Sequence, residues 1–154
     1  MMNLGFKVIQ ALAGKTLCTA ESCTGGGIGS SITAIPGSSA VYKGGIISYC
    51  NEVKHTLLQV DLKLLSAHGA VSAQVAEAMA VGARKMLSTD VAVSVTGLAG
   101  PGGDDYGNSV GTVFLGYADN ACVLSREFHF SGDREAVREQ AVYNALLLIL
   151  EMNP

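Results

Sequence analysis

The stretch from residue 16 to residue 28 reads TLCTAESCTGGGI, and it sets the class of the fold. Its first five residues predict a short buried strand over 16–20. Polar residues and three consecutive glycines follow, and isoleucines then recur at helical spacing until Pro36-Gly37 ends the helix. A strand, a polar turn and a helix in this order are the repeating unit of an α/β protein.

The rest of the chain continues the alternation of strands and helices. The limits of the helices and strands are predicted from the spacing of apolar residues, from the cap residue Ser72 and from the turn Asp119-Asn120. Helices are expected over 4–12, 51–60 and 73–87 and from 133 onward, and strands over 45–50, 91–96, 110–118 and 122–130. The last two strands form a hairpin, so we expect one α/β domain over 1–154 with a mixed β-sheet flanked by helices. The pattern does not give the order of the strands.

Composition excludes several classes of protein. The 154 residues are 49% apolar and 15% charged, which favours a compact core over disorder. The longest apolar run, 145–150, is far shorter than the roughly 20 residues that cross a bilayer, and no secretion signal opens the chain. The net charge of −3 and the scattered basic residues argue against a nucleic-acid partner.

The cysteines lack the spacing of a metal site. Cys18, Cys23, Cys50 and Cys122 form no CxxC or Cys/His pattern. We therefore expect reduced thiols in a cytoplasmic protein, with no metal and no cofactor. The glycine-rich loop 97–103 lacks the lysine of a phosphate-binding P-loop, although a tight loop after a buried strand is a common place for ligand contacts.

The turn after the first strand has residues that suit acyl transfer. Backbone N–H groups and the positive end of a helix at Glu21-Ser22-Cys23-Thr24 would hold a phosphate, or an oxyanion beside a nucleophilic hydroxyl. The alternative is that Ser22 or Thr24 only caps the helix. Glu21 could orient a lysine by an ion pair or be an exposed carboxylate, and both possibilities stay open.

Tyr49 and Lys54 are the candidate partners of Ser22. Five residues separate a tyrosine on the second strand from a lysine in the next helix, so both could face one cleft. Lysine acts as a base only if its pKa falls well below about 10.4, and burial under the Gly25–Gly27 turn would lower it. The alternative is two solvated surface residues. A Cys23 nucleophile ranks second, because no motif places a histidine beside it.

Seven motifs stand in one order along nearly the whole chain. They are Thr19-Ala-Glu-Ser-Cys-Thr-Gly-Gly26, Gly37-Ser-Ser39, Tyr49-x-Asn51-x-x-Lys54, Gly69-Ala-Val-Ser72, Thr96-Gly-Leu-Ala-Gly-Pro-Gly-Gly103, Gly111-Thr-Val113 and Phe130-Ser-Gly-Asp-Arg134. Together they resemble the C-terminal domain family of the competence/damage-inducible protein CinA. The family's stand-alone members include nicotinamide-nucleotide amidohydrolases. The resemblance implies a metal-free conversion of nicotinamide mononucleotide to nicotinate mononucleotide and ammonia.

The resemblance also implies a set of site residues. The catalytic serine, tyrosine and lysine of the family fall on Ser22, Tyr49 and Lys54. The candidate substrate-binding residues are Glu21, Thr24, Gly25, Gly26, Asn51, Thr96, Gly97, Gly100, Gly102 and Arg134. Many relatives carry Lys-Pro where this chain has Asn108-Ser109, so one positive charge that would help hold the phosphate is missing. Arg134 could bind the phosphate or form a salt bridge with Asp133.

Two classes of function remain at this point. The first is an amidohydrolase whose partner is a small nucleotide substrate and which acts without the N-terminal domain of its larger relatives. The second is a non-catalytic nucleotide-binding module, because glycine-rich loops suit binding as well as catalysis. The apolar, glycine-rich composition of so small a chain leads us to expect a homo-oligomer in either case.

Overall fold

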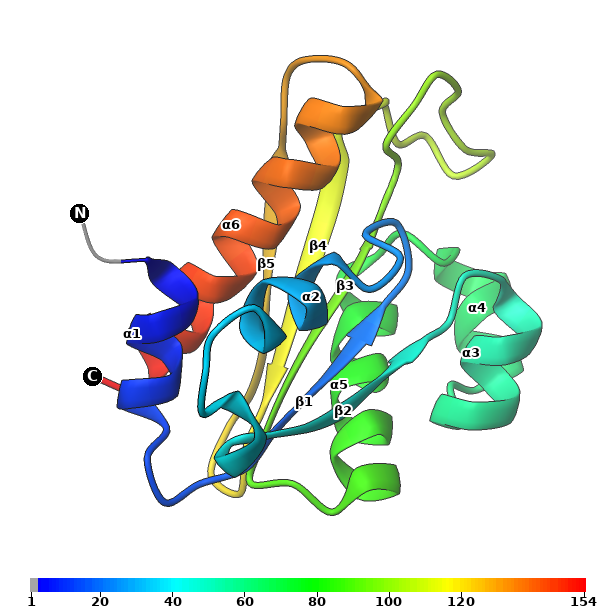
Figure 1. The fold of residues 1–154 in the computed structure, drawn as a ribbon. Coiled ribbons are helices and arrows are strands. Elements are labelled where there is room, and N and C mark those ends of the chain that lie inside the picture. The colour runs from blue at the N-terminus through cyan, green and yellow to red at the C-terminus, as the bar shows by residue number, and fades with distance from the viewer. Residues whose placement is uncertain (1–2) are drawn as a thin grey trace.

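A mixed sheet with the strand order β2-β1-β3-β4-β5 runs through the middle of the molecule (Figure 1). The computed structural model describes residues 3–154. β1 pairs in parallel with β2 and with β3, whereas β3, β4 and β5 are antiparallel neighbours. The strands are β1 (Leu17–Glu21), β2 (Tyr42–Ile47), β3 (Val91–Gly97), β4 (Thr112–Ala118) and β5 (Val123–His129).

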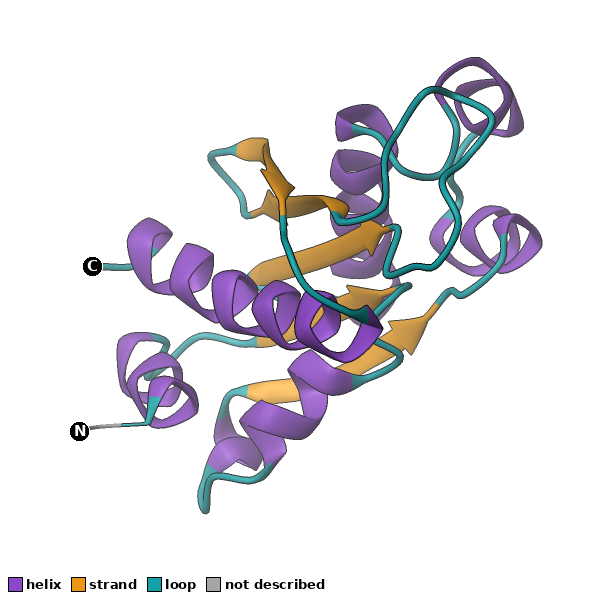
Figure 2. Ribbon diagram, turned by 90° about the horizontal axis from the view of Figure 1, so that it is seen from above, coloured by secondary structure: helices purple, strands orange, loops and turns teal. Residues whose placement is uncertain are grey.

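Helices cover both faces of the sheet, as the view from above shows (Figure 2). On one face lie α1 (Leu4–Ala11), α2 (Gly27–Thr33) and α6 (Arg134–Met152). On the other face lie α3 (Asn51–Leu58), α4 (Leu62–His68) and α5 (Ala73–Leu87), and a short 3-10 turn, Ser38–Ala40, precedes β2. Each face therefore has its own hydrophobic core, and the central strands are buried on both sides.

The order of the parallel strands fixes the place of a binding site. The chain leaves β1 through α2 to reach β2 on one side, and returns through α3, α4 and α5 to reach β3 on the other side. Right-handed crossovers in opposite directions put α2 and α5 on opposite faces. The loops that follow β1 and β3 diverge from the edge where these strands end, and such a switch point is the usual ligand site of an open α/β sheet.

The sequence predicted most of these elements correctly. The opening helix, the central strand β3, the β4–β5 hairpin and the helix that begins after Asp133 are confirmed, and Ser72 accepts the N–H of Val75 as the cap of α5. The α4 helix was not anticipated, and the second strand ends at Ile47 instead of continuing to residue 50. Tyr49 therefore lies in the loop after β2 and not on the strand. Within residues 3–154, no helix combines the length and apolarity that crossing a bilayer requires.

Small residues let α5 lie close to its neighbours. A Cβ atom on Gly116 of β4 would collide with the carbonyl oxygen of Ala76, and one on Gly82 would collide with the carbonyl oxygen of Leu58, the last residue of α3. Gly82 therefore sets how closely α3 approaches α5, and α3 is the helix that carries Lys54.

We expect Gly82→Ala to destabilise the protein by about 1–3 kcal/mol, because the methyl group would meet backbone that cannot rotate away. In an exposed helix, replacing glycine by alanine would instead stabilise the protein by about 1 kcal/mol. The sign of the measured change in unfolding free energy therefore shows whether the close approach of α3 to Gly82 dominates. Urea unfolding measures it. Gly102→Ala, where a Cβ meets nothing within 4 Å, is the control, and equal stability of both variants would contradict the prediction.

Candidate active site

A cleft of about 310 Å³ opens at the carboxyl ends of the parallel strands. The loops after β1, β2 and β3 and the first turn of α6 enclose it. In Figure 1 the first turn of α6 and the loop after β3 lie at the top, and the loops after β1 and β2 lie below them. Most of the residues predicted from the sequence line it: Ser22, Tyr49, Asn51, Lys54, Thr96, Gly97, Gly100, Gly102 and Arg134. The sequence did not single out the apolar wall, which consists of Ala70, Val71, Leu98 and Ala99. Ala70 and Val71 belong to the motif 69–72, and Leu98 and Ala99 belong to the motif 96–103. Membership of these motifs was the signal by which the sequence could have identified the wall.

Ser22 and Lys54 meet at the floor of this cleft. The Nζ atom of Lys54 lies 2.9 Å from the Oγ atom of Ser22 and donates a 2.6 Å hydrogen bond to the carbonyl oxygen of Ser48. Lys54 is 1% exposed and Ser22 is 8% exposed, although they are 32 residues apart in the chain. Neither residue is therefore the solvated surface group or simple helix cap that the sequence left open.

Burial lowers the pKa of the Lys54 amine from 10.5 to about 8. The dominant cause is the loss of water around the ammonium group, because the charged form is the one that burial penalises. A substantial fraction of Lys54 is therefore neutral near pH 8. A neutral amine has a lone pair, so it can accept the proton of the Ser22 hydroxyl at 2.9 Å.

Glu21 has a role that the sequence did not predict. Its carboxylate is 2% exposed and accepts hydrogen bonds from Thr24 Oγ1 (2.6 Å), Ile28 N (2.9 Å) and Gly29 N (3.0 Å). It thus occupies the N-terminal amides of α2, and is neither an exposed carboxylate nor an ion-pair partner of Lys54. Burial is therefore the cause that lowers the pKa of Lys54, and Glu21 does not oppose it through an ion pair.

The glycine turn after Ser22 lies behind the cleft and does not line it. Gly25 and Gly26 have φ angles of 57° and 104°, a left-handed conformation that favours glycine. The N–H of Gly25 donates to the carbonyl oxygen of Ser22, so it is not the free oxyanion donor expected from the sequence. Glu21, Thr24, Gly25 and Gly26 do not line the cleft, and Thr24 donates to Glu21 within the turn, so their part in substrate binding stays a prediction. The N–H group of Thr24 has no hydrogen-bond acceptor within residues 3–154.

Tyr49 and Arg134 form the rim of the cleft. Arg134 donates to the hydroxyl oxygen of Tyr49 at 3.0 Å and to the carbonyl oxygen of Gly100 at 2.6 Å. Tyr49 is 62% exposed and bonds to Arg134, so the structure brings Lys54 but not Tyr49 into contact with Ser22. Asp133 caps α6 through the N–H of Ala136. The guanidinium of Arg134 therefore bridges two loops, in place of the suggested salt bridge with Asp133.

Cys23 is the weaker candidate nucleophile. Burial raises the pKa of its thiol to about 11, so the thiol stays protonated at neutral pH. The cleft lining contains no histidine that could activate it. Among residues 3–154, no three His, Cys, Asp or Glu side chains gather closely enough to hold a metal ion.

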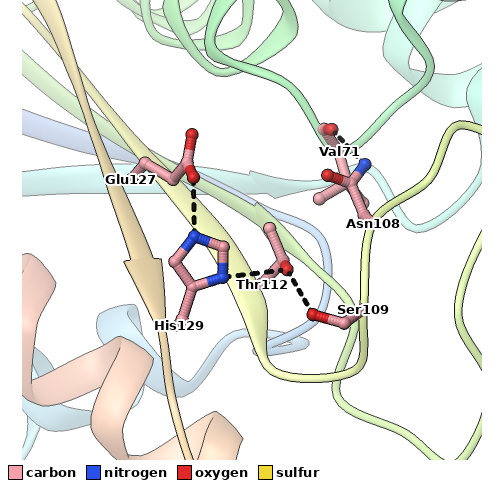
Figure 3. A network of polar contacts seen from close by, with 6 residues as sticks. All are labelled: Val71, Asn108, Ser109, Thr112, Glu127 and His129. Carbon is pink, nitrogen blue, oxygen red and sulfur yellow. Dashed lines mark hydrogen bonds and ion pairs between the residues drawn. The ribbon is translucent and has the colours of Figure 1, made fainter.

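A second polar network connects β4 and β5 (Figure 3). His129 lies 2.6 Å from the carboxylate of Glu127 and 3.3 Å from the Thr112 hydroxyl, which lies 3.5 Å from the hydroxyl of Ser109. The order of carboxylate, imidazole and hydroxyl resembles a hydrolase triad. However, Thr112 is 1% exposed, and these residues do not line the cleft. The network therefore joins the two strands of the hairpin.

Asn108, where the family resemblance leads us to expect a lysine, takes part in the fold of its own loop. Its amide nitrogen donates to the carbonyl oxygen of Val71 at 3.0 Å (Figure 3). The same nitrogen donates to the carboxylate of Asp104 at 2.8 Å. It does not line the cleft. Asn108 therefore fastens the loop after β3 to the segment that precedes α5.

Comparison with known proteins assigns the family. The model of the CinA C-terminal domain matches residues 4–153. This chain belongs to the CinA C-terminal domain family. A CinA-like protein of Thermosynechococcus vestitus is 50% identical over 146 residues, which are 91% of this chain and 35% of the relative. A CinA-like protein of Geobacter sp. strain M21 is 51% identical over 134 residues, which are 87% of this chain and 32% of the relative. The chain thus spans about a third of these CinA-like proteins.

Solved CinA structures share the whole fold. The competence/damage inducible protein CihA of Agrobacterium tumefaciens has a TM-score of 0.94 at 38% identity, covering 98% of this chain and 94% of that one. A CinA superfamily protein of Escherichia coli has a TM-score of 0.95 at 34% identity, covering 97% of this chain and 88% of that one. The family resemblance found in the sequence motifs is confirmed.

The buried amine predicts a pH dependence of stability. The pKa of Lys54 is about 8 in the folded protein and near 10.5 when the chain is unfolded. The penalty for the buried charge is therefore fully present below pH 8 and disappears between pH 8 and 10.5. Over this window we expect the wild type to gain up to about 3 kcal/mol of unfolding free energy relative to Lys54→Met. Urea unfolding at both ends of the window measures it. A difference in unfolding free energy between the wild type and Lys54→Met that stays the same at all pH values would contradict the buried neutral amine. The control is Lys63→Met, because Lys63 is exposed.

Proposed function

We propose that this chain hydrolyses the carboxamide of nicotinamide mononucleotide, releasing nicotinate mononucleotide and ammonia. The observation that carries the proposal is the 2.9 Å contact between Ser22 Oγ and the buried Nζ of Lys54. A lysine buried beside a serine destabilises the fold in its charged form. A module that only binds nucleotides gains nothing from this arrangement, whereas an acyl-transfer enzyme with a serine nucleophile needs a base beside the serine.

The proposed reaction begins with neutral Lys54. Its amine takes the hydroxyl proton of Ser22 as the serine oxygen forms a bond to the carboxamide carbon. We assign the free N–H group of Thr24, two residues after Ser22, as a donor to the resulting oxyanion. The protonated amine of Lys54 then gives its proton to the departing nitrogen, so the carbon–nitrogen bond breaks and ammonia leaves. A water molecule, deprotonated by the same amine, hydrolyses the ester on Ser22.

The rim of the cleft suits the charges of this substrate. Arg134 donates only to neutral oxygens, those of Tyr49 and Gly100, and has no carboxylate partner within residues 3–154. Its positive charge therefore remains available for a phosphate. The exposed ring of Tyr49 offers a face on which a pyridinium cation can stack. The side chain of Asn51 has no hydrogen-bond partner within residues 3–154, and we assign it to the carboxamide.

The direct test is to incubate the protein with nicotinamide mononucleotide and to measure ammonia. We expect Ser22→Ala to reduce ammonia release by about 10³-fold or more, since the covalent intermediate cannot form. Cys23→Ala should stay within about tenfold of the wild type, because the thiol is protonated and serves as core filling. An active Ser22→Ala variant together with an inactive Cys23→Ala variant would assign the reaction to the thiol. Binding of the nucleotide without ammonia release would favour a binding module.

The rate should follow the ionisation of Lys54. We expect kcat/KM to rise with pH and to level off above the pKa of about 8, because only the neutral amine accepts the proton of Ser22. Lys54→Arg keeps the positive charge but cannot lose its proton, so it should be nearly as inactive as Lys54→Ala. An active arginine variant would mean that Lys54 supplies charge alone, and the base would then have to be Tyr49.

A further inference from the structure

The turn that carries Ser22 is clamped from two sides. Glu21 holds the inner side through the helix amides described above. On the outer side, Arg138 of α6 donates from Nε to the carbonyl oxygen of Cys23 at 3.0 Å and from Nη2 to that of Thr24 at 3.2 Å. One planar guanidinium therefore fixes the direction of two consecutive carbonyl groups.

The direction of a carbonyl group also fixes the N–H group of the same peptide. The atoms of a trans peptide are coplanar, with the C=O and N–H bonds pointing in opposite directions. Because the Cys23 carbonyl points to Arg138, the N–H of Thr24 points away from Arg138. Thr24 and Arg138 line a groove on the outside of the turn, whereas Ser22 and Cys23 line the catalytic cleft. The N–H of Thr24 is thus directed to the side of the turn away from the outer groove.

The backbone of this turn needs an external constraint. Gly25 and Gly26 are both in the left-handed region and have no side chain to restrict rotation. A charged donor on the carbonyl side also polarises the peptide, which makes its N–H a stronger donor to an anion.

The geometry points to Arg138 as a positioning residue that directs the free amide N–H group of Thr24 at the oxyanion. This inference rests on the proposed amidohydrolase function, and it concerns a residue that does not line the cleft. Arg138 lies four residues after Arg134, on the same side of α6. The two arginines contact different parts of the site: Arg134 bonds to Tyr49 at the rim, and Arg138 bonds to the Cys23 carbonyl in the turn.

The first test compares Arg138→Met with Arg126→Met. Arg126 lies on β5 and pairs with Glu151 at the surface. Arg126→Met therefore removes one arginine and its contacts, as Arg138→Met does, but at a position far from the Ser22 turn. We expect Arg138→Met to lower kcat by about 10- to 100-fold, with KM changed less than about threefold, because a displaced oxyanion donor affects the transition state. The pKa in the pH–rate profile should stay at the wild-type value, and Arg138→Lys should recover part of the rate. An unchanged kcat would overturn the inference. A shifted pKa would overturn it as well, because it would show that the Ser22–Lys54 contact itself had been lost.

The second test does not depend on the substrate. A fluorophosphonate probe labels an activated serine: the oxygen of Ser22 bonds to phosphorus, fluoride leaves with the bonding electrons, and Lys54 receives the hydroxyl proton. The phosphonyl oxygen then occupies the position of the oxyanion. We expect mass spectrometry to show labelling of Arg138→Met about tenfold slower than labelling of the wild type and of Arg126→Met.

The outcomes separate the two proposals. Equal labelling rates for Arg138→Met and the wild type would overturn the role of Arg138. Slow labelling of Arg138→Met, combined with a wild type that is labelled at Ser22 but releases no ammonia, would support the role of Arg138 and refute the proposed substrate. A wild type that is neither labelled nor active on nicotinamide mononucleotide would refute both.

Discussion

The burial of one lysine amine is the constraint on which the rest of the site depends. Lys54 is 1% exposed, and its amine lies between the Ser22 hydroxyl and the carbonyl oxygen of Ser48. An ammonium group at this position is poorly solvated, so its pKa falls to about 8. The same burial that weakens the fold at neutral pH thus leaves an amine that loses its proton readily next to a serine hydroxyl.

The topology of the sheet explains how these groups meet. Ser22 follows β1, Ser48 follows β2, and Lys54 lies one turn into α3. Because β1 and β2 are parallel neighbours, both strands end at the same edge of the sheet. β3 ends there as well, and the glycine-rich loop that follows it lines the cleft. The N-terminal turns of α6 close the arrangement from the opposite end of the sequence, through Arg134 and Arg138.

Burial and access, more than residue type, distinguish the candidate site from the other polar cluster. The network of Glu127, His129 and Thr112 has the residues of a hydrolase triad, but it belongs to a hairpin and lies outside the cleft (Figure 3). Ser22 and Lys54 lack histidine, yet they share a buried contact at the floor of a cleft. An environment that shifts a pKa at an accessible position is the stronger indication of catalysis.

The sequence by itself determined the α/β class, most of the helices and strands, and the family, because periodicity, caps and motifs are local properties. It also indicated Ser22 and Lys54 as partners through their motifs. Only the tertiary structure decided that these two side chains touch and that Tyr49 bonds to Arg134 at the rim. The order of the strands and the clamp of Arg138 on the Cys23 carbonyl were likewise out of reach. The physical reason is that contacts between residues 32 to 115 positions apart depend on how the sheet is assembled, and no local pattern contains that information.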